Sequence, residues 1–521
     1  MRPSALLILA ACQREGEPPR FRHGTPALGD AIPALPLVRE LTVRLDRPAH
    51  VRVRLEDDRG VRTLTFPDET DALTVPLLGL LPDETVVVNV QAERDGVDVW
   101  SGPQAFRTGS LPERFPILDT VVPARDDVTP GLLLFPTESI AEDLGYVVAV
   151  DEHDRVVWLW EAPLEFGDVR LDSAGTLLAL AGGVAWRVSL TGEILSQWGA
   201  VRVDPAPRSA FVPIDANTLN HELFPTADGA FLSITPRARL VGDYPCSYDA
   251  PTVSCGPATL QDAEVIHFDP NGVVRWRWSL VDALDPFRIG FDSLDALGEL
   301  RDWAHANGVI VLPDQSVLVS VRHQDALAAF APDGQLSWIL GNPDGWSDAL
   351  RPYLLQPVGE PFAWPWHQHG PAVGDDGTLW MFDNGDWGGS PYAPADPGHV
   401  QQSRVVGYRV DAQARTVEQV ASFSETGTGW VYSRALGNAQ PLGGGHVLGV
   451  WGMPTSEGAT LNEDLGYGSR YARMVEFDAQ GDVVRDLRVR SDVEVEPLGW
   501  RSYRAVHVPS LYPPGIEQWE E

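Results

Sequence analysis

Hydrophobic residues occur along most of this chain in short runs separated by turns that are rich in Asp, Gly and Pro. Such runs, with many Val, Leu, Ile, Trp and Phe, predict β-strands. One half-unit, an Asp/Gly turn followed by an apolar strand, recurs at residues 151–158, 191–198, 269–276, 332–338 and 478–484, with a weaker copy near Asp411. A second half-unit of the same kind begins at Asp172, Asp228, Asp314, Asp376 and Gly443. Strand-turn-strand units repeated over residues 118–521 predict a β-propeller, and six turn copies favour six blades over five or seven.

Residues 35–111 have a β pattern of their own. Residues 41–45 and 51–55 alternate between apolar and polar side chains, which predicts strands with one exposed face. Residues 79–90 and 101–108 resemble the last strands of a fibronectin type III domain, although Val86 stands where that family usually has a tyrosine. We therefore expect an all-β chain in which a small fibronectin type III or Ig-like sandwich precedes the propeller. Between the blades, residues 292–303 are expected to form a short helix.

The composition excludes several kinds of chemistry. The 521 residues include 39 basic ones, and all of these are Arg, so no lysine is present to bind phosphate, form a Schiff base or act as a general base. The net charge of −34 argues against nucleic acid and against an anionic membrane surface as partners. An anionic small substrate remains compatible with this charge, because a local Arg/His cluster can outweigh a distant, salt-screened field.

The first residues have the pattern of an export signal. Arg2 is followed by the apolar run Ala5-Leu-Leu-Ile-Leu9 and by Leu-Ala-Ala-Cys12, which resembles the bacterial lipoprotein box and implies a lipid on Cys12; a fortuitous match is the alternative. Residues 1–12 are too short to span a membrane as a helix, and the Pro-rich residues 13–34 are expected to be a tether. The sequence therefore predicts an exported protein of the periplasm or cell envelope, with a lipid anchor as its contact with a membrane.

Two further cysteines, Cys246 and Cys255, lie in a loop rich in Tyr, Pro and Ser. In an exported chain this spacing predicts a local disulfide that staples an insertion. Metal binding is the less favoured alternative, because no His or further Cys lies close by in the sequence.

Four polar residues lie where inner strands of successive blades begin. They are His221, His305 and His369 and, by way of the strand that follows the 305–307 motif, Arg322. Because inner strands of a propeller line one central channel, these side chains are expected to converge on a site suited to a tetrahedral oxyanion. The alternative is that such histidines are structural, as we expect for His446. His323 alternates with Arg322 along a predicted strand, so it should point away from the site.

Five motifs together resemble the bacterial aryl-sulfate sulfotransferases: 302–307 (Asp-Trp-Ala-His-Ala-Asn), 320–324 (Ser-Val-Arg-His-Gln), 338–341 (Trp-Ile-Leu-Gly), 368–369 (Gln-His) and 382–385 (Phe-Asp-Asn-Gly). The resemblance extends to Ser502-Tyr-Arg504. It implies an exported, six-bladed propeller behind a β-sandwich domain, acting without a phosphoadenosine cofactor. We expect no metal in the site.

The resemblance also implies roles for the residues. His369 would attack the sulfur of an aryl sulfate ester and carry the sulfuryl group as sulfohistidine until a phenol accepts it, with His367 as the alternative nucleophile. Arg322 would supply positive charge, and His305 and His221 would donate to sulfuryl or bridging oxygens. Asn307 and Gln368 would bind or orient the substrate. The aromatic residues Trp364, Trp366, Trp387 and Tyr392 could stack on a phenyl ring, although core packing is the commoner role of any one of them.

The sequence is also compatible with functions other than sulfuryl transfer. A non-catalytic propeller that binds a ligand or partner is the main alternative, and the retention of His305, Arg322 and His369 argues against it. Sulfatase-like hydrolysis would be a side reaction, because the Cys-X-Pro-X-Arg motif of formylglycine sulfatases is absent. A quinone-dependent dehydrogenase is disfavoured, since the chain has no adjacent cysteine pair. The oligomeric state is left open, with a homodimer as one option.

Overall fold

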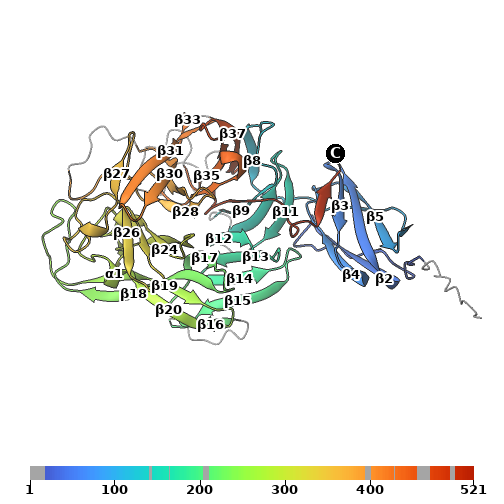
Figure 1. Cartoon of the computed structure of the whole chain (residues 1–521), viewed down its shortest axis with the longest axis horizontal. Helices are drawn as coiled ribbons and strands as arrows, with labels where there is room; N and C mark the ends of the chain where they lie inside the picture. The colour runs from blue at the N-terminus through green and yellow to red at the C-terminus, as the bar shows by residue number, and fades with distance from the viewer. Residues whose placement is uncertain are drawn as a thin grey trace, which may run out of the picture. The chain divides into compact units, whose positions relative to one another are not determined.

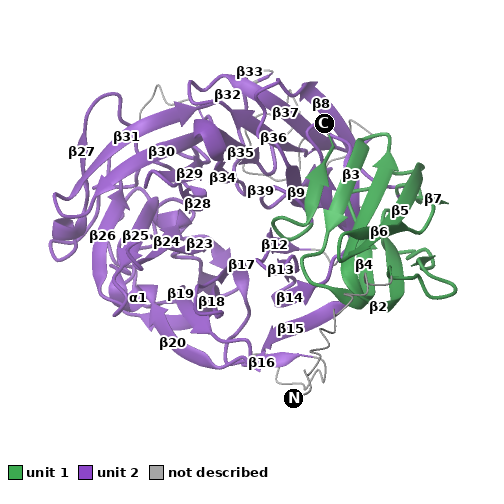
Figure 2. Cartoon of the chain, turned by 45° about the vertical axis from the view of Figure 1, so that its right-hand side comes forward, with its two compact units in different colours: residues 1–111, 512–521 green, residues 112–511 purple. Residues whose placement is uncertain are grey.

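A computed structural model describes residues 18–139, 143–162, 165–202, 211–393, 401–427, 429–454, 470–492 and 499–520. The chain divides into two compact units, residues 1–111 with 512–521 and residues 112–511, which Figure 2 shows in different colours. The predicted all-β class is confirmed, and the four helical segments are each a single short turn: α1 (Leu280–Ala283), η1 (Arg322–Gln324), η2 (Arg351–Tyr353) and η3 (Gly443–Gly445). Among the residues described, no helix is both long enough and apolar enough to cross a bilayer.

The first unit is a set of eight connected strands. They are β1 (Ala27–Leu28), β2 (Arg39–Asp57), β3 (Gly60–Thr65), β4 (Thr70–Leu77), β5 (Thr85–Arg94), β6 (Val97–Trp100), β7 (Gln104–Arg107) and β40 (Glu517–Trp519). The two predicted strands at 41–45 and 51–55 are parts of one continuous strand, β2, in which alternate residues are buried over 41–45 and again over 49–55. Its first half pairs with β1 and β4 and its second half with β3 and β5, so β2 joins two groups of strands.

Two boundaries of this unit differ from the sequence prediction. Within the predicted tether 13–34, Phe21 forms a bridge with Leu45, and β1 pairs with β2, so the described part of this segment from Phe21 onward is held against the sheet by backbone hydrogen bonds. At the other end, β40 pairs with β3, so residues 512–521 belong to the first unit and not to the propeller. Cys12 lies outside the described residues.

The second unit is the predicted six-bladed propeller (Figure 1). Blade 1 contains β9 (Leu132–Ser139), β10 (Leu144–Val150), β11 (Val156–Glu161), β38 (Trp500–Arg501) and β39 (Val506–Val508). Blade 2 contains β12 (Phe166–Leu171), β13 (Leu177–Ala181), β14 (Val184–Val188), β15 (Ile194–Ala200) and β16 (Val212–Ile214). Blade 3 contains β17 (Asn220–Pro225), β18 (Phe231–Val241), β19 (Ala258–Phe268) and β20 (Val274–Ser279), with the hairpin β21 (Ala296–Leu297) and β22 (Leu300–Arg301) beside β19.

The other three blades follow the same plan. Blade 4 contains β23 (Ala306–Val311), β24 (Val317–Val321), β25 (Ala326–Phe330) and β26 (Leu336–Gly341). Blade 5 contains β28 (His369–Val373), β29 (Leu379–Asp383), β30 (Arg404–Asp411), β31 (Thr416–Phe423) and β27 (Gln356–Val358). Blade 6 contains β34 (Asn438–Pro441), β35 (Val447–Trp451), β36 (Ala472–Phe477), β37 (Val483–Arg490) and β8 (Ile117–Val122), and a small hairpin, β32 (Glu425–Thr426) with β33 (Gly429–Trp430), stands apart.

The ring is closed twice. The early strand β8 pairs with β37 at the outer edge of blade 6, and the late strands β38 and β39 pair with β9 at the inner edge of blade 1. The first strand of the propeller sequence is therefore hydrogen-bonded to a late blade, and the last strands are hydrogen-bonded to the first blade. Neither closing edge is left unpaired.

The predicted turns follow one local rule. In the turns at Asp151, Asp269 and Asp478 the carboxylate accepts hydrogen bonds from backbone N–H groups two and four residues later, at 2.9–3.1 Å. These Asx turns reverse the chain without help from distant contacts. The predicted helix over 292–303 is wrong, because Gly298, with φ of 65°, turns the chain into the hairpin β21–β22.

Candidate active site

The inner strands of the propeller begin with an unusual backbone. His221 (φ 64°), His305 (41°) and His367 (53°) all adopt the left-handed conformation, as do Glu165 and Leu436 at the corresponding points of blades 2 and 6. The strand pairing is irregular at the same places, where β17, β23 and β28 meet their neighbours. A left-handed residue with a side chain costs on the order of 1 kcal/mol or more. The fold therefore maintains strained residues at the starts of β17, β23 and β28, where the histidines lie.

The histidines form a row across blades 3, 4 and 5. The ring centroids of His221 and His305 are 5.2 Å apart, those of His305 and His323 are 4.7 Å apart, and those of His323 and His367 are 5.7 Å apart. His323 thus lies inside the cluster, which corrects the expectation that it would point away. Residues 322–324 form the 3-10 turn η1 and not a continuation of β24, so Arg322 and His323 do not alternate between faces.

His369 is the first residue of β28 and is almost completely buried. Its Nδ1 lies 2.7 Å from Oδ1 of Asn384, whose own amide nitrogen donates to the carbonyl oxygens of Ser433 and Leu436 at 2.8 and 3.1 Å. Those two bonds fix the Asn384 amide with its oxygen toward the imidazole, so Nδ1 of His369 carries the proton. Burial, followed by the charge of Arg322, holds the pKa of His369 well below its usual value, so the ring is neutral and Nε2 has a lone pair.

His367 has the opposite environment two residues earlier. It is fully buried, with Nδ1 2.7 Å from Oδ1 of Asp325 and Nε2 3.5 Å from Oδ2 of Asp292. Burial by itself would lower the pKa of His367, but the charge of Asp325, the hydrogen bond to it and the nearby carboxylate of Asp292 raise it to about 9. His367 is therefore an imidazolium at neutral pH, with a proton on each ring nitrogen.

His305 and His323 share one acidic neighbour. Asp302 Oδ2 lies 2.5 Å from Nδ1 of His305, while the backbone oxygen of Asp302 lies 2.5 Å from Nδ1 of His323. Despite burial, the charge of His305 and its hydrogen bond hold the pKa of Asp302 well below its usual range. Nε2 of His323 lies 2.6 Å from Nη1 of Arg322, and burial holds the pKa of His323 well below 6.5, so His323 accepts from the guanidinium.

His221 is paired with a tyrosine from the end of the propeller sequence. Its Nδ1 lies 2.8 Å from the hydroxyl of Tyr503, which follows β38 in blade 1. Burial and the charge of His305 lower the pKa of His221 to about 3, and burial raises that of Tyr503, so both groups are neutral. The next residue, Arg504, anchors this segment by binding Glu222 at 2.8 Å and Asp168 at 3.2 Å.

Two guanidinium groups lie beside two shared carboxylates at the edge of the cluster. Asp292 Oδ2 lies 3.5 Å from Nη2 of Arg322 and 3.2 Å from Nη2 of Arg434. Asp386 Oδ2 lies 3.8 Å from Nη2 of Arg322 and 3.4 Å from Nε of Arg434. The side chain of Arg322 is 8% exposed and that of Arg434 is 24% exposed, so Arg434 is the more accessible of the two.

The two predicted substrate-binding residues lie beneath the cluster and are fully buried. The Asn307 amide donates to the backbone oxygen of Gln368 at 2.8 Å, and the Gln368 amide donates to Ser320 Oγ and to the backbone oxygen of Ala326 at 3.1 and 2.9 Å. These bonds join blades 4 and 5 and thereby fix the start of β28. The side-chain oxygens of both amides, Oδ1 of Asn307 and Oε1 of Gln368, have no hydrogen-bond partner.

Two sets of side chains in the cluster have the donor atoms for a metal ion: Asp292 with His323 and His367, and Asp302 with His305 and His323. In both sets, however, His323 Nε2 already accepts from Arg322, and Arg322 also contacts Asp292. A divalent cation would have to displace this guanidinium and bear its charge at close range. The arrangement therefore suits an arginine-bound anion better than a metal.

The four aromatic candidates do not gather around one point. Trp387 lies beside the cluster, where its indole N–H donates to Asp292 Oδ1 at 3.1 Å and its ring stacks on Phe291 with centroids 4.7 Å apart. Trp364 packs edge-on against Phe362, and Tyr392 accepts from the backbone N–H of Ile289 at 3.0 Å. Trp366 is partly buried, and its backbone N–H donates to Asp383.

Several residues of the cluster were not identified from the sequence. They are Asp292, Asp302, Asp325, Asp386, Asn384, Arg434 and Tyr503. Three of them had a signal, because Asp302 lies in the 302–307 motif, Asn384 in the 382–385 motif and Tyr503 in the 502–504 motif. The other three aspartates cannot be distinguished from the many acidic residues of the chain, and Arg434 lies in no motif.

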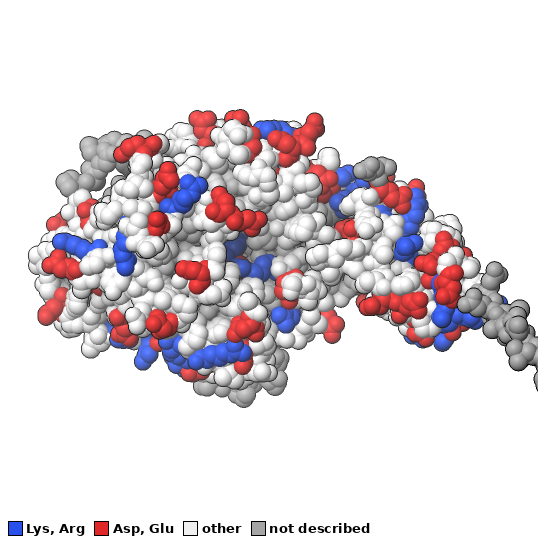
Figure 3. All heavy atoms as spheres, viewed as in Figure 1, with Lys and Arg blue, Asp and Glu red and all other residues white. Residues whose placement is uncertain are grey.

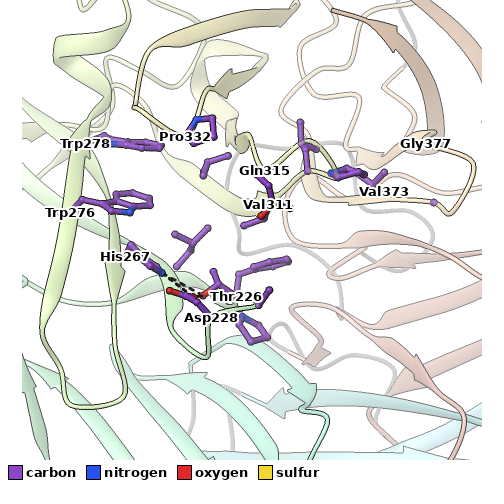
Figure 4. Close-up of a pocket in the computed structure, with 18 of the residues that line it drawn as sticks. Thr226, Asp228, His267, Trp276, Trp278, Val311, Gln315, Pro332, Val373 and Gly377 are labelled. Carbon is purple, nitrogen blue, oxygen red and sulfur yellow. Dashed lines mark hydrogen bonds and ion pairs between the residues drawn. The ribbon is translucent and has the colours of Figure 1, made fainter.

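Other features lie away from this cluster. Cys246 and Cys255 are joined by a disulfide with Cα atoms 5.9 Å apart, and His446 binds Glu476 at 2.7 Å. A cavity of about 980 Å³ lies at the opposite ends of β17 and β23, where the stacked Trp276 and Trp278 form one wall (Figure 4). It contains none of the predicted site residues. On the face seen in Figure 3, acidic side chains are scattered with basic ones between them.

Comparisons with known proteins identify a family that matches most of the propeller. The family described as Arylsulfotransferase (ASST) matches residues 120–501. Arylsulfate sulfotransferase AssT of Escherichia coli O6:H1 is 35% identical over 214 residues, which cover 32% of this chain and 35% of that protein. AssT of Lelliottia amnigena is 28% identical over 216 residues, with the same coverage. The chain thus spans about a third of the length of these curated relatives. A solved protein of unknown function from Bacteroides caccae is 14% identical with a TM-score of 0.40, covering 72% of this chain and 98% of its own.

Proposed function

This chain belongs to the arylsulfotransferase family, and we propose that it moves a sulfuryl group from an aryl sulfate ester to a phenol through a sulfohistidine at His369, without a phosphoadenosine cofactor. The observation that carries the proposal is the pairing of a neutral, buried imidazole with the fixed amide of Asn384. A nucleophilic imidazole needs one nitrogen with a lone pair, and this pairing places the proton on Nδ1 of His369 and the lone pair on Nε2, which the backbone N–H of Leu436 approaches at 3.3 Å.

The contrast with His367 supports this choice of nucleophile. An imidazolium held between Asp325 and Asp292 has no lone pair to offer, and its pKa of about 9 keeps it in that form at neutral pH. In the proposed reaction His367 instead contributes positive charge next to the transferring group.

The first half-reaction breaks the bond between sulfur and the aryl oxygen. Nε2 of His369 attacks the sulfur in line, the N–S bond forms, and the aryl oxygen leaves with the bonding electrons as a phenolate that then takes up a proton. Negative charge on the three sulfuryl oxygens is stabilised by the guanidinium of Arg322, with His305 and His221 as hydrogen-bond donors. Asn307 and Gln368 act by fixing the start of β28.

The second half-reaction reverses these steps with a new phenol. The acceptor oxygen attacks the sulfur of the sulfohistidine as its proton passes to a base, the N–S bond breaks, and its electrons return to Nε2 as a lone pair. The neutral His221, whose pKa is lowered to about 3, is too weak a base to keep this proton, so it can accept a hydrogen bond from the phenol while the proton passes to water.

The reaction can be tested with 4-nitrophenyl sulfate as donor. We expect release of 4-nitrophenol that rises with the concentration of a second phenol, together with formation of the sulfated second phenol. Incubation with donor alone should leave one sulfuryl group per chain, found on His369 by mass spectrometry after digestion at alkaline pH. Release that does not depend on the acceptor would instead indicate hydrolysis, and absence of release from folded protein would favour a binding propeller.

We also propose export of the chain and lipid attachment at Cys12, which the leader pattern of residues 1–12 supports. Metabolic labelling with a fatty acid analogue in a bacterial host should label the wild-type chain and not a Cys12→Ser variant. Equal labelling of both would contradict this part of the proposal. Light scattering of the purified protein would decide between a monomer and the homodimer that the sequence leaves open.

A further inference from the structure

We propose that Arg434 is a second anion-recognition residue of this site, which selects an aryl ligand that bears a sulfate or sulfonate group by neutralising the carboxylates beside Arg322. This inference rests on the proposed function for its choice of ligand. Arg434 belongs to none of the motifs that identified the other residues. It lies in the segment before β34, two residues before Leu436, whose backbone N–H reaches Nε2 of His369 at 3.3 Å.

The geometry sets Arg434 beside Arg322. The two guanidiniums contact the same oxygen of Asp292, at 3.2 and 3.5 Å, and the same oxygen of Asp386, at 3.4 and 3.8 Å. The two positive groups therefore lie next to each other, with the carboxylates between them. The tetrahedral head of a sulfate ester has three terminal oxygens, more than one guanidinium can bind, so adjacent guanidiniums match its shape and its charge.

The charges show why Arg322 is insufficient by itself. Asp292 is held ionised, because its ion pair with His367 at 3.5 Å and the charge of Arg322 lower its pKa far below the usual range despite burial. Asp386 accepts a hydrogen bond from the Tyr432 hydroxyl at 2.7 Å in addition to its contacts with the two arginines. With Arg434 present, the three carboxylates of Asp292, Asp325 and Asp386 face three cations, Arg322, Arg434 and His367. Without Arg434 the carboxylates would outnumber the cations by one, which would weaken the binding of an anion.

An aromatic surface is fixed to the same carboxylate. The indole N–H of Trp387 donates to Asp292 Oδ1 at 3.1 Å, and the Trp387 ring stacks on Phe291 at 4.7 Å. Asp292 thus holds a cation on one oxygen and a large planar ring on the other. Both rings are partly exposed, as a surface that meets an aryl group must be. The chemical class that fits is an aromatic ring with an attached monoanionic sulfur oxyanion.

Binding of an unreactive analogue tests this independently of turnover. Calorimetric titration should compare naphthalene-2-sulfonate, the anion, with 2-naphthol, its neutral counterpart. In Arg434→Gln we expect sulfonate affinity to fall on the order of 10- to 100-fold, and 2-naphthol affinity to change less than about twofold, since only the anion feels the uncovered carboxylate. The loss should shrink as salt is raised, because screening weakens charge repulsion. Arg409→Gln, at an exposed Arg–Glu pair of blade 5, is the matched control.

A second variant separates charge from structure. Arg434→Gln combined with Asp386→Asn restores the balance of charges and should recover most of the sulfonate affinity, and thermal melts show whether each variant is folded. Equal weakening of both ligands by Arg434→Gln, no weakening of the sulfonate, or no recovery in the folded double variant would each overturn the inference. If the wild type binds the sulfonate selectively yet transfers no sulfuryl group, the proposed function fails and the inference stands.

Discussion

The histidine cluster has two halves that differ in their hydrogen-bond partners. In the acid-paired half, His305 and His367 bind Asp302 and Asp325. In the neutral half, His221 and His369 bind the hydroxyl of Tyr503 and the amide of Asn384. Carboxylate partners raise the pKa of His367 to about 9, whereas His221 and His369, which have no such partners, have lowered pKa values. The hydrogen-bond partner thus decides the protonation state of each imidazole: His367 is positively charged, whereas His369 is neutral and has a lone pair.

The largest effect should come from the neutral half. His369→Ala removes the proposed nucleophile, and we expect turnover of 4-nitrophenyl sulfate to fall by at least about 10⁴-fold, as when a covalent nucleophile is deleted elsewhere. Sulfuryl labelling of the chain should disappear as well. His153→Ala, at a histidine whose side chain is 67% exposed, is the control. Turnover within tenfold of the wild type would place the nucleophile elsewhere, with His367 as the next residue to test.

The role of the neutral partner can be tested by giving His369 an acidic partner, as His367 has. Asn384→Asp puts a carboxylate against His369, which should raise the pKa of that imidazole and keep it protonated. We expect turnover at pH 7 to fall about 100-fold and to recover as pH rises through the new pKa, where the lone pair returns. The readout is the pH profile of kcat/KM, with Asn271→Asp at an exposed turn as control. An unchanged profile would show that Asn384 does not set the state of His369.

A smaller effect is expected at the other neutral pair. Tyr503→Phe removes the hydroxyl that orients His221, and we predict a loss on the order of tenfold in kcat/KM, with the histidine still present but free to turn. Rescue is not expected from pH, because neither group carries charge near neutrality. Tyr353→Phe, outside the cluster, controls for the substitution itself. A loss as large as that from His221→Ala would mean that Tyr503 acts directly on the substrate.

The acid-paired half should show its effect in stability more than in rate. Asp325→Asn removes the charge that raises the pKa of His367. In the wild type this raised pKa adds up to about 3 kcal/mol to the free energy of unfolding below pH ~6.5, and the contribution is lost as pH rises through about 9. Denaturation curves between pH 6 and 10 should therefore lose much of this pH dependence in the variant. Asp348→Asn, at a side chain 92% exposed, should keep it.

The sequence predicted the fold well because both of its signals are local. Asx turns and short apolar strands are determined within a few residues, so the six blades could be recognised from repeated turns alone. The continuity of β2 and the return of β40 to the first unit depend on pairing between distant segments, which periodicity does not report.

The candidate site was predicted only in part, for a similar reason. His221, His305 and His369 lie at the starts of inner strands and Arg322 lies in the turn after β24, and the structure brings the four together. The partners that decide what each imidazole does, such as Asp325 for His367 and Tyr503 for His221, come from other blades. His323 was misplaced because period-two alternation fails where a strand gives way to a 3-10 turn.

Closure of the ring at blade 1 also brings Tyr503 to the candidate site. This residue reaches His221 from the connection between β38 and β39, the late strands that complete blade 1. A nascent chain that ended before β38 would therefore lack one member of the candidate site. The proposed sulfuryl transfer would thus depend on completion of the ring, and turnover would report that completion.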